Sequence, residues 1–210
     1  MKLAFIDLEG TLIHGSEWEN IRNKFGAEGL SEDYSRLYDA GKIGFEEWRQ
    51  KLAEVWHKNK ATKKDFVSEL NKYKVLSGAK ELIVGLKKKG YKTFLVTGAI
   101  SILAELVQKE LGIDEIYCAH EFLFDKNNIF LSIKTHPEYG RGQGKVKIIK
   151  EIIKRYKTDE KECITIGGDD INDYWMIKDF NSFAVNSPVK QIREVAKHNV
   201  NKLVDVLSLI

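Results

Sequence analysis

Cysteine and proline are both scarce in this sequence, and each scarcity excludes a class of protein. Two cysteines among 210 residues are too few for a disulfide framework. Cys118 and Cys163 stand in apolar, strand-like runs, so we expect small buried hydrophobic side chains and neither a disulfide nor a metal pair. Two prolines and the absence of low-complexity segments leave no linker that would divide the chain.

Long apolar runs and an excess of one charge sign are also absent. No stretch approaches the roughly 18 apolar residues of a membrane span. In the N-terminal MKLAFIDLEGTL, acidic residues follow after only a few apolar ones, which argues against a signal peptide. With 34 basic and 31 acidic residues interspersed, the formal charge of +3 offers no electrostatic footprint for nucleic acid. We therefore expect a cytoplasmic protein that binds neither membranes nor nucleic acid.

What the sequence does contain is a regular alternation of strand-like and helix-like segments. Residues 2–6 form a short apolar run that suits a strand buried on both faces. Beyond residue 77 the expected helices cover residues 79–89, 100–111 and 146–156, and the expected strands 93–96, 116–119, 163–166 and 182–185. A hairpin is expected over residues 121–133, turning at residues 126–128. This alternation predicts an α/β fold, a doubly wound, Rossmann-like parallel sheet with helices on both faces.

Residues 15–76 interrupt this alternation with helical patterns alone. Four apolar side chains recur there at helical spacing and are expected to form its core: Phe45, Trp48, Leu52 and Val55. Thr62 and Asp65 resemble a capping box at the start of a further helix. We expect a small all-helical cap domain at residues 15–76, inserted into an α/β core domain formed by residues 1–14 and 77–210.

Polar residues follow three of the expected strands. They are the segments DLEGT (7–11), TGA (97–99) and GGDDIND (167–173). Parallel strands open their carboxyl ends on one edge of the sheet, so several carboxylates would crowd one crevice. Their repulsion and desolvation would be costly unless a cation neutralises them. Oxygen ligands without nearby His or Cys favour a hard ion, and Mg²⁺ fits best. Lys145, at the start of a helix, adds one positive charge.

These segments together resemble the haloacid dehalogenase superfamily, most nearly its phosphoserine-phosphatase-like branch. The resemblance covers most of the chain and is carried by FIDLEGTL (5–12), LVTGA (95–99), Lys145 and GDDINDYWM (168–176). Each motif alone is weakly specific, whereas the four in this order, one per strand end, are strongly so.

The resemblance implies a catalytic role for four residues. Asp7 would be the nucleophile that forms an aspartyl-phosphate. Glu9 would protonate the leaving oxygen and then activate water. Thr97 and the amide of Gly98 would hold phosphate oxygens, and Lys145 would offset the charge on them.

The resemblance also implies a Mg²⁺ site. Asp7, Asp169 and the backbone carbonyl of Glu9 would bind the ion, and Asp173 would steady the ligands around it. Asn172 would contact the phosphate. We expect a Mg²⁺-dependent phosphatase acting on a small phosphorylated metabolite.

Two residues depart from the family pattern, where Asp and Gly are usual. Glu9 carries one extra methylene, so its carboxyl reaches about 1.5 Å further. Because the metal contact there is a backbone oxygen, only the acid–base step should respond. Asp170 adds a negative charge beside the metal site, and the sequence offers no account of it.

Simpler interpretations exist for the same residues. Asp7 alone could be a turn carboxylate, and Thr97 a helix cap. Lys147 and Lys150 are rivals of Lys145 on a lysine-rich helix. The Gly-rich approach to Lys145 is not a P-loop, because Val146 follows where Ser or Thr is needed. Five histidines lack ligand spacing and are not expected to bind metal: His14, His57, His120, His136 and His198.

Residues of the expected cap indicate which substrates the protein could bind. The segment GKIGFE (41–46) resembles that of phosphoserine phosphatases, but the arginine that clamps the serine carboxylate there falls on Leu52 here. The acid that pairs the serine amine falls on Ser16, with Glu17 one place away. Losing a bidentate clamp makes phosphoserine a doubtful substrate. Cap residues are candidates for contacting another leaving group, although a surface position is the simpler interpretation of each: Glu17, Trp18, Arg22, Arg36 and Arg49.

Two alternatives stay open. The phosphoryl group could pass to an acceptor alcohol in place of water. From a different class, the chain could be a non-enzymatic phospho-receiver or phosphate-sensing module, since receiver domains also combine Asp, Mg²⁺, Thr and Lys on a doubly wound sheet. Glu9 and the insertion argue against a receiver, and nothing in the sequence indicates the oligomeric state.

Overall fold

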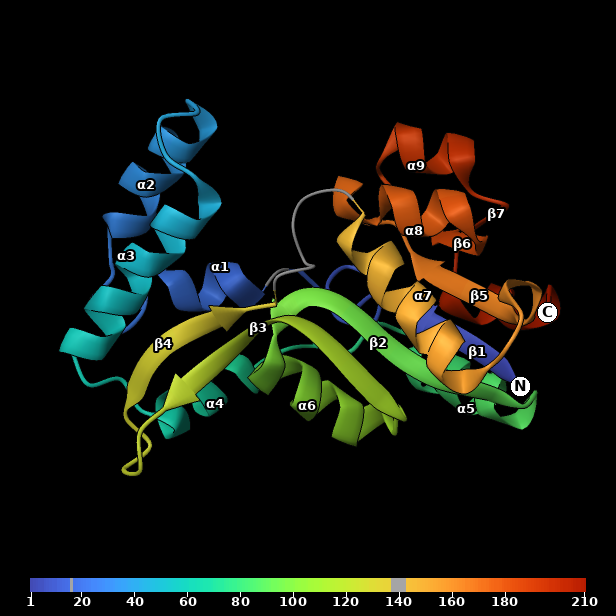
Figure 1. Cartoon of the computed structure of the whole chain (residues 1–210), viewed down its shortest axis with the longest axis horizontal. Coiled ribbons are helices and arrows are strands. Elements are labelled where there is room, and N and C mark those ends of the chain that lie inside the picture. The colour runs from blue at the N-terminus through green and yellow to red at the C-terminus, as the bar shows by residue number, and fades with distance from the viewer. Residues whose placement is uncertain (16, 137–142) are drawn as a thin grey trace.

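The computed structural model of the chain describes residues 1–15, 17–136 and 143–210. Within them, a sheet follows the order β4-β3-β2-β1-β5-β6-β7 (Figure 1). Its strands are β1 (Lys2–Ile6), β2 (Tyr91–Ile100), β3 (Glu115–Phe124), β4 (Phe130–Thr135), β5 (Cys163–Gly167), β6 (Asn181–Val185) and β7 (His198–Val200). Every neighbouring pair is parallel except β3 and β4, which are antiparallel. The predicted α/β class and parallel sheet are confirmed.

Helices cover both faces of this sheet. They are α5 (Ala79–Lys88), α6 (Ser101–Leu111), α7 (Gly144–Tyr156), α8 (Tyr174–Asp179) and α9 (Lys190–Val195), with short 3₁₀ helices η1 (Glu160–Glu162), η2 (Ile171–Asp173) and η3 (Leu203–Ser208). Alternate residues of β1 belong to different apolar clusters. Ala4 and Ile6 pack with α5 and α6, whereas Leu3 and Phe5 pack with α7 and α8. This period-two partition shows why β1 is apolar throughout: both of its faces are buried.

Among the described residues between β1 and α5, the structure contains four helices. They are α1 (Glu17–Arg22), α2 (Leu30–Asp39), α3 (Phe45–Lys58) and α4 (Lys63–Leu70). The capping box predicted for α4 is present: Thr62 Oγ1 accepts from the Asp65 amide, and the Thr62 amide donates to an Asp65 carboxylate oxygen. The expected helical content is therefore observed, while the division into a core and a cap domain stays a prediction.

Several expected boundaries are wrong. β3 is one strand that joins residues 116–119 to the first arm of the expected hairpin, because polar His120 and Glu121 lie inside it. β2 runs on to Ile100 and includes residues 97–99, with a register shift against β3 at that end. The sequence analysis also missed α8, α9 and β7. Elements of three to six residues are too short to show a periodic pattern.

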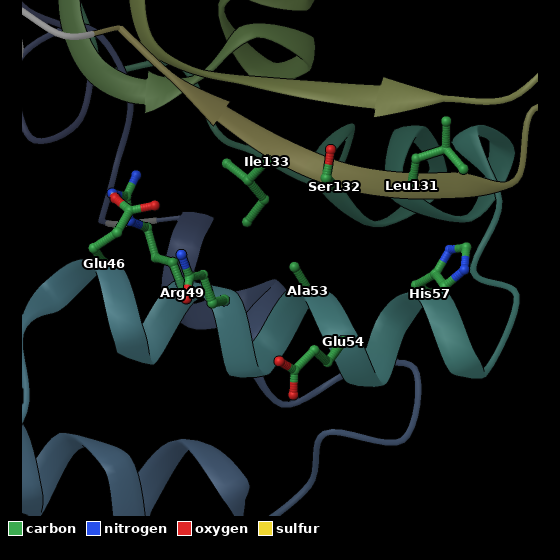
Figure 2. Close-up of a pocket in the computed structure, with 9 residues that line it drawn as sticks. Glu46, Arg49, Ala53, Glu54, His57, Leu131, Ser132 and Ile133 are labelled. Carbon is green, nitrogen blue, oxygen red and sulfur yellow. The ribbon is translucent and has the colours of Figure 1, made fainter.

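An aromatic cluster joins α3 and α4 to the β3–β4 hairpin. Trp56, Phe66, Phe122 and Phe130 pack with ring centroids 5.0–5.8 Å apart. The Phe130 amide also donates to the Ala61 carbonyl over 2.8 Å. Figure 2 shows α3 running alongside β4, where the two elements line a groove of about 360 Å³. The helical segment thus shares one continuous apolar core with the sheet.

We predict that Phe66→Ala destabilises the protein by about 3–5 kcal/mol, because it leaves a cavity that neighbouring rings fill only in part. Phe66 has no exposed surface and packs on Phe25, Trp56 and Phe122. Urea unfolding measures the change. Val84→Ala, at a side chain that is 43% exposed, serves as the control and should cost well under about 1 kcal/mol. A similar small cost for both variants would contradict the interpretation of this cluster as core.

Candidate active site

The strands β1, β2 and β5 bring three polar segments to one edge of the sheet. Ile6, the last residue of β1, pairs with Leu95 on one side and with Ile166 on the other. The next residue, Asp7, donates its amide to the Ile166 carbonyl over 2.9 Å. Since all three strands are parallel, the segments at their carboxyl ends meet at this edge.

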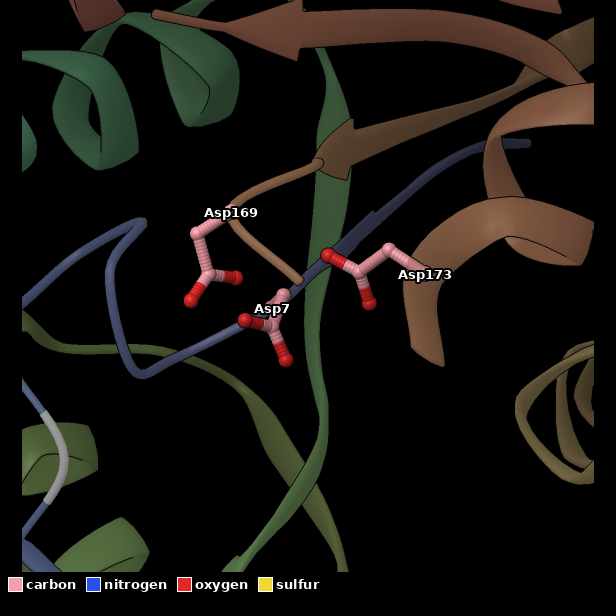
Figure 3. Close-up of side chains that lie close together, drawn as sticks. All are labelled: Asp7, Asp169 and Asp173. Atoms are coloured by element: carbon pink, nitrogen blue, oxygen red, sulfur yellow. The ribbon is translucent and has the colours of Figure 1, made fainter. Parts of the chain in front are cut away.

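Three carboxylates from these segments lie together. Asp7, Asp169 and Asp173 each offer an oxygen, and these oxygens lie within 4.8 Å of one another (Figure 3). Asp7 and Asp173 are buried, and Asp169 is half-buried. Among the described residues they form a group that could hold a metal ion.

A lysine ammonium lies between two of these carboxylates. Lys145 Nζ donates to Asp7 Oδ1 over 2.5 Å and to Asp173 Oδ1 over 2.6 Å. Lys145 is buried at the start of α7, whereas Lys147 and Lys150 on the same helix are exposed. The structure thus brings Lys145, and not its two rivals, to Asp7.

Three carboxylates lie against one ammonium at this site. Burial raises the pKa of the Asp7 carboxyl well above its usual value, and the Asp173 charge raises it further, against the opposing effect of Lys145. Burial, followed by Asp173, raises the pKa of Asp169 to about 7. One ammonium therefore does not offset three carboxylates. A hard divalent cation would, and oxygen-only donors are the ligands that Mg²⁺ prefers.

Two glycines allow these carboxylates to approach the backbone. Gly10 has a φ of +70°, and a Cβ there would lie 2.3 Å from Asp169 Oδ2. A Cβ on Gly167 would lie 2.5 Å from Asp173 Oδ2. A side chain at either position would displace a carboxylate of the site.

Backbone and side-chain hydrogen bonds orient the segment after β5. The Gly168 amide donates to Asp173 Oδ2 over 2.7 Å. Asp170, which the sequence left without an account, is exposed, and its Oδ1 accepts from the Asn172 amide over 2.8 Å. It therefore caps η2, the turn that carries Asn172 and Asp173. Sequence reasoning missed Ser187, which is buried and donates from Oγ to the Gly168 carbonyl over 2.5 Å. No motif marks that serine.

The other expected catalytic residues lie near the same edge. Thr97 is buried, and its Oγ1 accepts from the Ala99 amide over 3.0 Å. Gly98 is exposed, and a Cβ there would meet no atom within 4 Å. Glu9 is half-buried, with its backbone in an isolated bridge to Ile13.

The expected cap contacts fall into different environments. The surface interpretation is wrong for Arg49, which is 5% exposed and contacts His120 and Thr135 of the hairpin. Arg36 is exposed beside Glu32 and Asp33.

Other residues of the expected cap differ in burial. Leu52 is 1% exposed within the apolar core. Arg22, the last residue of α1, is half-buried. Glu17 and Trp18 lie in α1, whereas Ser16 falls outside the described residues, as does Gly142 of the Gly-rich approach.

Every helix in the described part of the chain is too short or too polar to cross a membrane.

Comparisons with known proteins agree with this geometry. The chain is 27% identical over 220 residues to a phosphoserine phosphatase of Archaeoglobus fulgidus, covering 99% of this chain and 60% of that protein. It is 23% identical over 177 residues to a phosphoserine phosphatase of Methanocaldococcus jannaschii, covering 84% and 81% of the two chains. The chain thus spans less than two thirds of the Archaeoglobus relative.

Solved structures share the fold. One, described as a phospho-aspartyl intermediate analogue of phosphoserine phosphatase, superposes with a TM-score of 0.78 at 21% identity and covers 100% of this chain and 98% of that one. A family model described as haloacid dehalogenase-like hydrolase matches residues 1–181, most of the chain. Together with the carboxylates that converge at the ends of β1 and β5, this match shows that the chain belongs to the haloacid dehalogenase-like hydrolases.

Proposed function

We propose that this hydrolase is a Mg²⁺-dependent phosphatase that cleaves a small phosphorylated metabolite through an aspartyl-phosphate on Asp7. The observation that supports it best is the convergence of Asp7, Asp169 and Asp173, with the Lys145 ammonium between Asp7 and Asp173. Phosphoryl transfer depends mainly on positioning and on stabilising negative charge. A buried nucleophilic carboxylate flanked by one fixed cation and a site for a second meets both needs.

In the first step, an Asp7 carboxylate oxygen attacks phosphorus and the bond from phosphorus to the leaving oxygen breaks. The Glu9 carboxyl gives its proton to that oxygen, which departs as an alcohol. The Lys145 ammonium, the Thr97 hydroxyl and the Gly98 amide offset the charge on the phosphoryl oxygens, and Asn172 contacts the phosphate. Mg²⁺, held by Asp7, Asp169 and the Glu9 carbonyl, would add positive charge to the same oxygens.

In the second step, the Glu9 carboxylate takes a proton from water, which attacks phosphorus of the aspartyl-phosphate. The bond between phosphorus and the Asp7 oxygen breaks, which releases phosphate and restores Asp7. Glu9 is longer than the usual aspartate, so its carboxyl can serve a leaving oxygen that lies slightly further from the backbone. Asp173, held by Lys145 and by the Gly168 amide, keeps the surrounding charges in place.

The cap limits the choice of substrate. The relatives are named phosphoserine phosphatases, yet the position expected to hold the serine carboxylate is Leu52, which is buried in the apolar core. An aliphatic side chain offers no hydrogen bond to a carboxylate. We therefore propose a small phosphorylated metabolite whose leaving group is not held by a cation at this position; Glu17 stays a candidate for its recognition, whereas Arg49 is buried against His120 and Thr135.

We predict that Asp7→Asn lowers the rate of p-nitrophenyl phosphate hydrolysis by at least about 10³-fold while the fold is kept, because an amide is a poor nucleophile. Phosphate release measures the rate, and circular dichroism the fold. Asp179→Asn, at an exposed aspartate on α8, is the matched control and should be as active as the wild type. Near-normal turnover by Asp7→Asn would eliminate the mechanism. If the wild-type protein instead becomes stably phosphorylated by a phosphodonor and releases no phosphate, the result would support the receiver alternative.

We predict that Mg²⁺ raises the melting temperature of the chelator-treated protein by several degrees. Ligand at about 100 times its Kd adds about 2.7 kcal/mol to the free energy of unfolding, and each kcal/mol shifts a chain of this size by about 2–4 °C. Asp169→Asn should remove most of this shift, because it deletes a carboxylate ligand. Differential scanning fluorimetry measures both proteins. An equal shift in the two would show that the ion binds elsewhere.

A further inference from the structure

Arg49 is a buried cation on α3 whose contacts reach a different part of the fold. Its Nη1 lies 2.6 Å from His120 Nδ1 on β3 and donates to Thr135 Oγ1 on β4 over 2.5 Å. Its Nη2 donates to the Glu46 carboxylate one turn earlier on α3. The guanidinium therefore connects the helical segment to both strands of the hairpin.

The proton positions in this contact follow from the chemistry of arginine. A guanidinium can only donate, so His120 Nδ1 must accept and the ring proton must lie on Nε2. Burial, and then the Arg49 charge, lower the pKa of His120 to about 3. His120 is therefore a neutral acceptor at physiological pH, and the Arg49 charge is balanced by Glu46.

The contact lies at the same end of the sheet as the catalytic carboxylates. His120 pairs with Ile100, the last residue of β2, three residues beyond Thr97 and past the register shift between β2 and β3. His120 also pairs with Thr135, the last residue of β4. Arg49 thus contacts β3 and β4 beyond the level of Thr97, at the end of the sheet where the substrate is proposed to bind.

Apolar contacts already hold α3 on the hairpin. Trp56 packs on Phe122 and Phe130 with ring centroids 5.8 and 5.7 Å away. Apolar burial is non-directional, but His57 gives α3 a directional contact near its C-terminal end, where His57 Nδ1 lies 2.8 Å from the Phe130 carbonyl oxygen. Near the N-terminal end of α3, the planar guanidinium of Arg49 has donors in fixed positions, so its contacts with His120 and Thr135 hold at one position of the helix only. In Figure 2, Glu46 and Arg49 occupy one end of the groove and His57 and Leu131 the other, so this constraint acts at one end of α3.

We propose that Arg49 is a positioning residue that fixes the N-terminal end of α3 on the hairpin, and thereby the room left for the leaving group of the substrate. The proposal rests on the proposed phosphatase function. Arg49 acts here through His120 and Thr135 and takes no part in the chemical steps. Arg49 would affect which phosphoesters fit, because the position of α3 determines how much space lies between the helical segment and the proposed active site.

The test compares Arg49→Met with the wild type. Methionine has a similar length and favours helix. Its substitution leaves no buried charge, since Glu46 is 59% exposed and His120 is neutral. Thr135 Oγ1 lies 3.4 Å from His120 Nδ1, so these two groups can bond to each other. We expect a melting temperature within about 3 °C of the wild type.

The decisive readout is the ratio of kcat/KM for a bulky and a compact phosphoester, p-nitrophenyl phosphate and glycerol 3-phosphate. Arg49→Met should change this ratio at least about 5-fold, and Arg49→Lys, which keeps a donor without the planar fork, should recover part of the change. Lys51→Met is the matched control, because it removes an exposed cation paired with Glu54 on the same helix. It should leave the ratio unchanged. An equal loss of activity on both esters in Arg49→Met would overturn the proposal.

Hydrogen exchange provides a readout that needs no substrate. The amides of α3 should exchange at least about 5-fold faster in Arg49→Met, while those of β1 and β5 keep the wild-type rate. If Arg49→Met fails to fold, Thr135→Val, which deletes one acceptor, is measured in the same way. Unchanged exchange in α3 would overturn the proposal. If the wild type hydrolyses neither ester, the phosphatase function fails while the exchange rates still decide the role of Arg49.

Discussion

The crowding of three carboxylates against one ammonium is the constraint on which the site depends. Asp7, Asp169 and Asp173 lie within reach of one another in a largely buried crevice, and Lys145 alone is placed between two of them. Burial and mutual repulsion raise the pKa values of Asp7 and Asp169. Such an arrangement is costly for folding, and the proposed Mg²⁺ would offset that cost by neutralising the carboxylates.

The sheet topology makes this crowding possible. Parallel pairing of β1 with β2 and β5 places the following residues at one edge, although they are far apart in the sequence. Glycine at positions 10 and 167 then lets Asp169 and Asp173 approach to distances that any Cβ would prevent. Asp170 and Ser187 contribute by bonding the backbone of the same segment. The positions of the carboxylates therefore depend on how closely the backbone packs around them.

The β3–β4 hairpin at the edge of the sheet attaches the helical segment to the rest of the fold. Its outer part carries Phe122 and Phe130, on which the helices α3 and α4 pack, so the helical segment is attached to the core by apolar burial. Arg49 adds a directional contact to that burial, at the level just beyond Thr97. Directional contacts near both ends of α3, from Arg49 to His120 and from His57 to Phe130, thus add to the apolar burial that attaches the helix to the hairpin.

Local pattern determined much of this protein. The apolar run of β1, the alternation of strands with helices and the motifs at strand ends were sufficient to predict the α/β fold, its parallel sheet and the family to which it belongs. These features are legible because each depends on residues that are close in sequence.

Tertiary structure decided the rest. It brought Lys145, and not Lys147 or Lys150, to Asp7, because the orientation of α7 on the sheet decides which of its lysines faces the site. It extended β3 through His120 and Glu121, because cross-strand pairing outweighs the polar character of single residues. It also buried Arg49 against partners 71 and 86 residues away. A sequence pattern cannot show contacts that depend on which surfaces meet after the chain has folded.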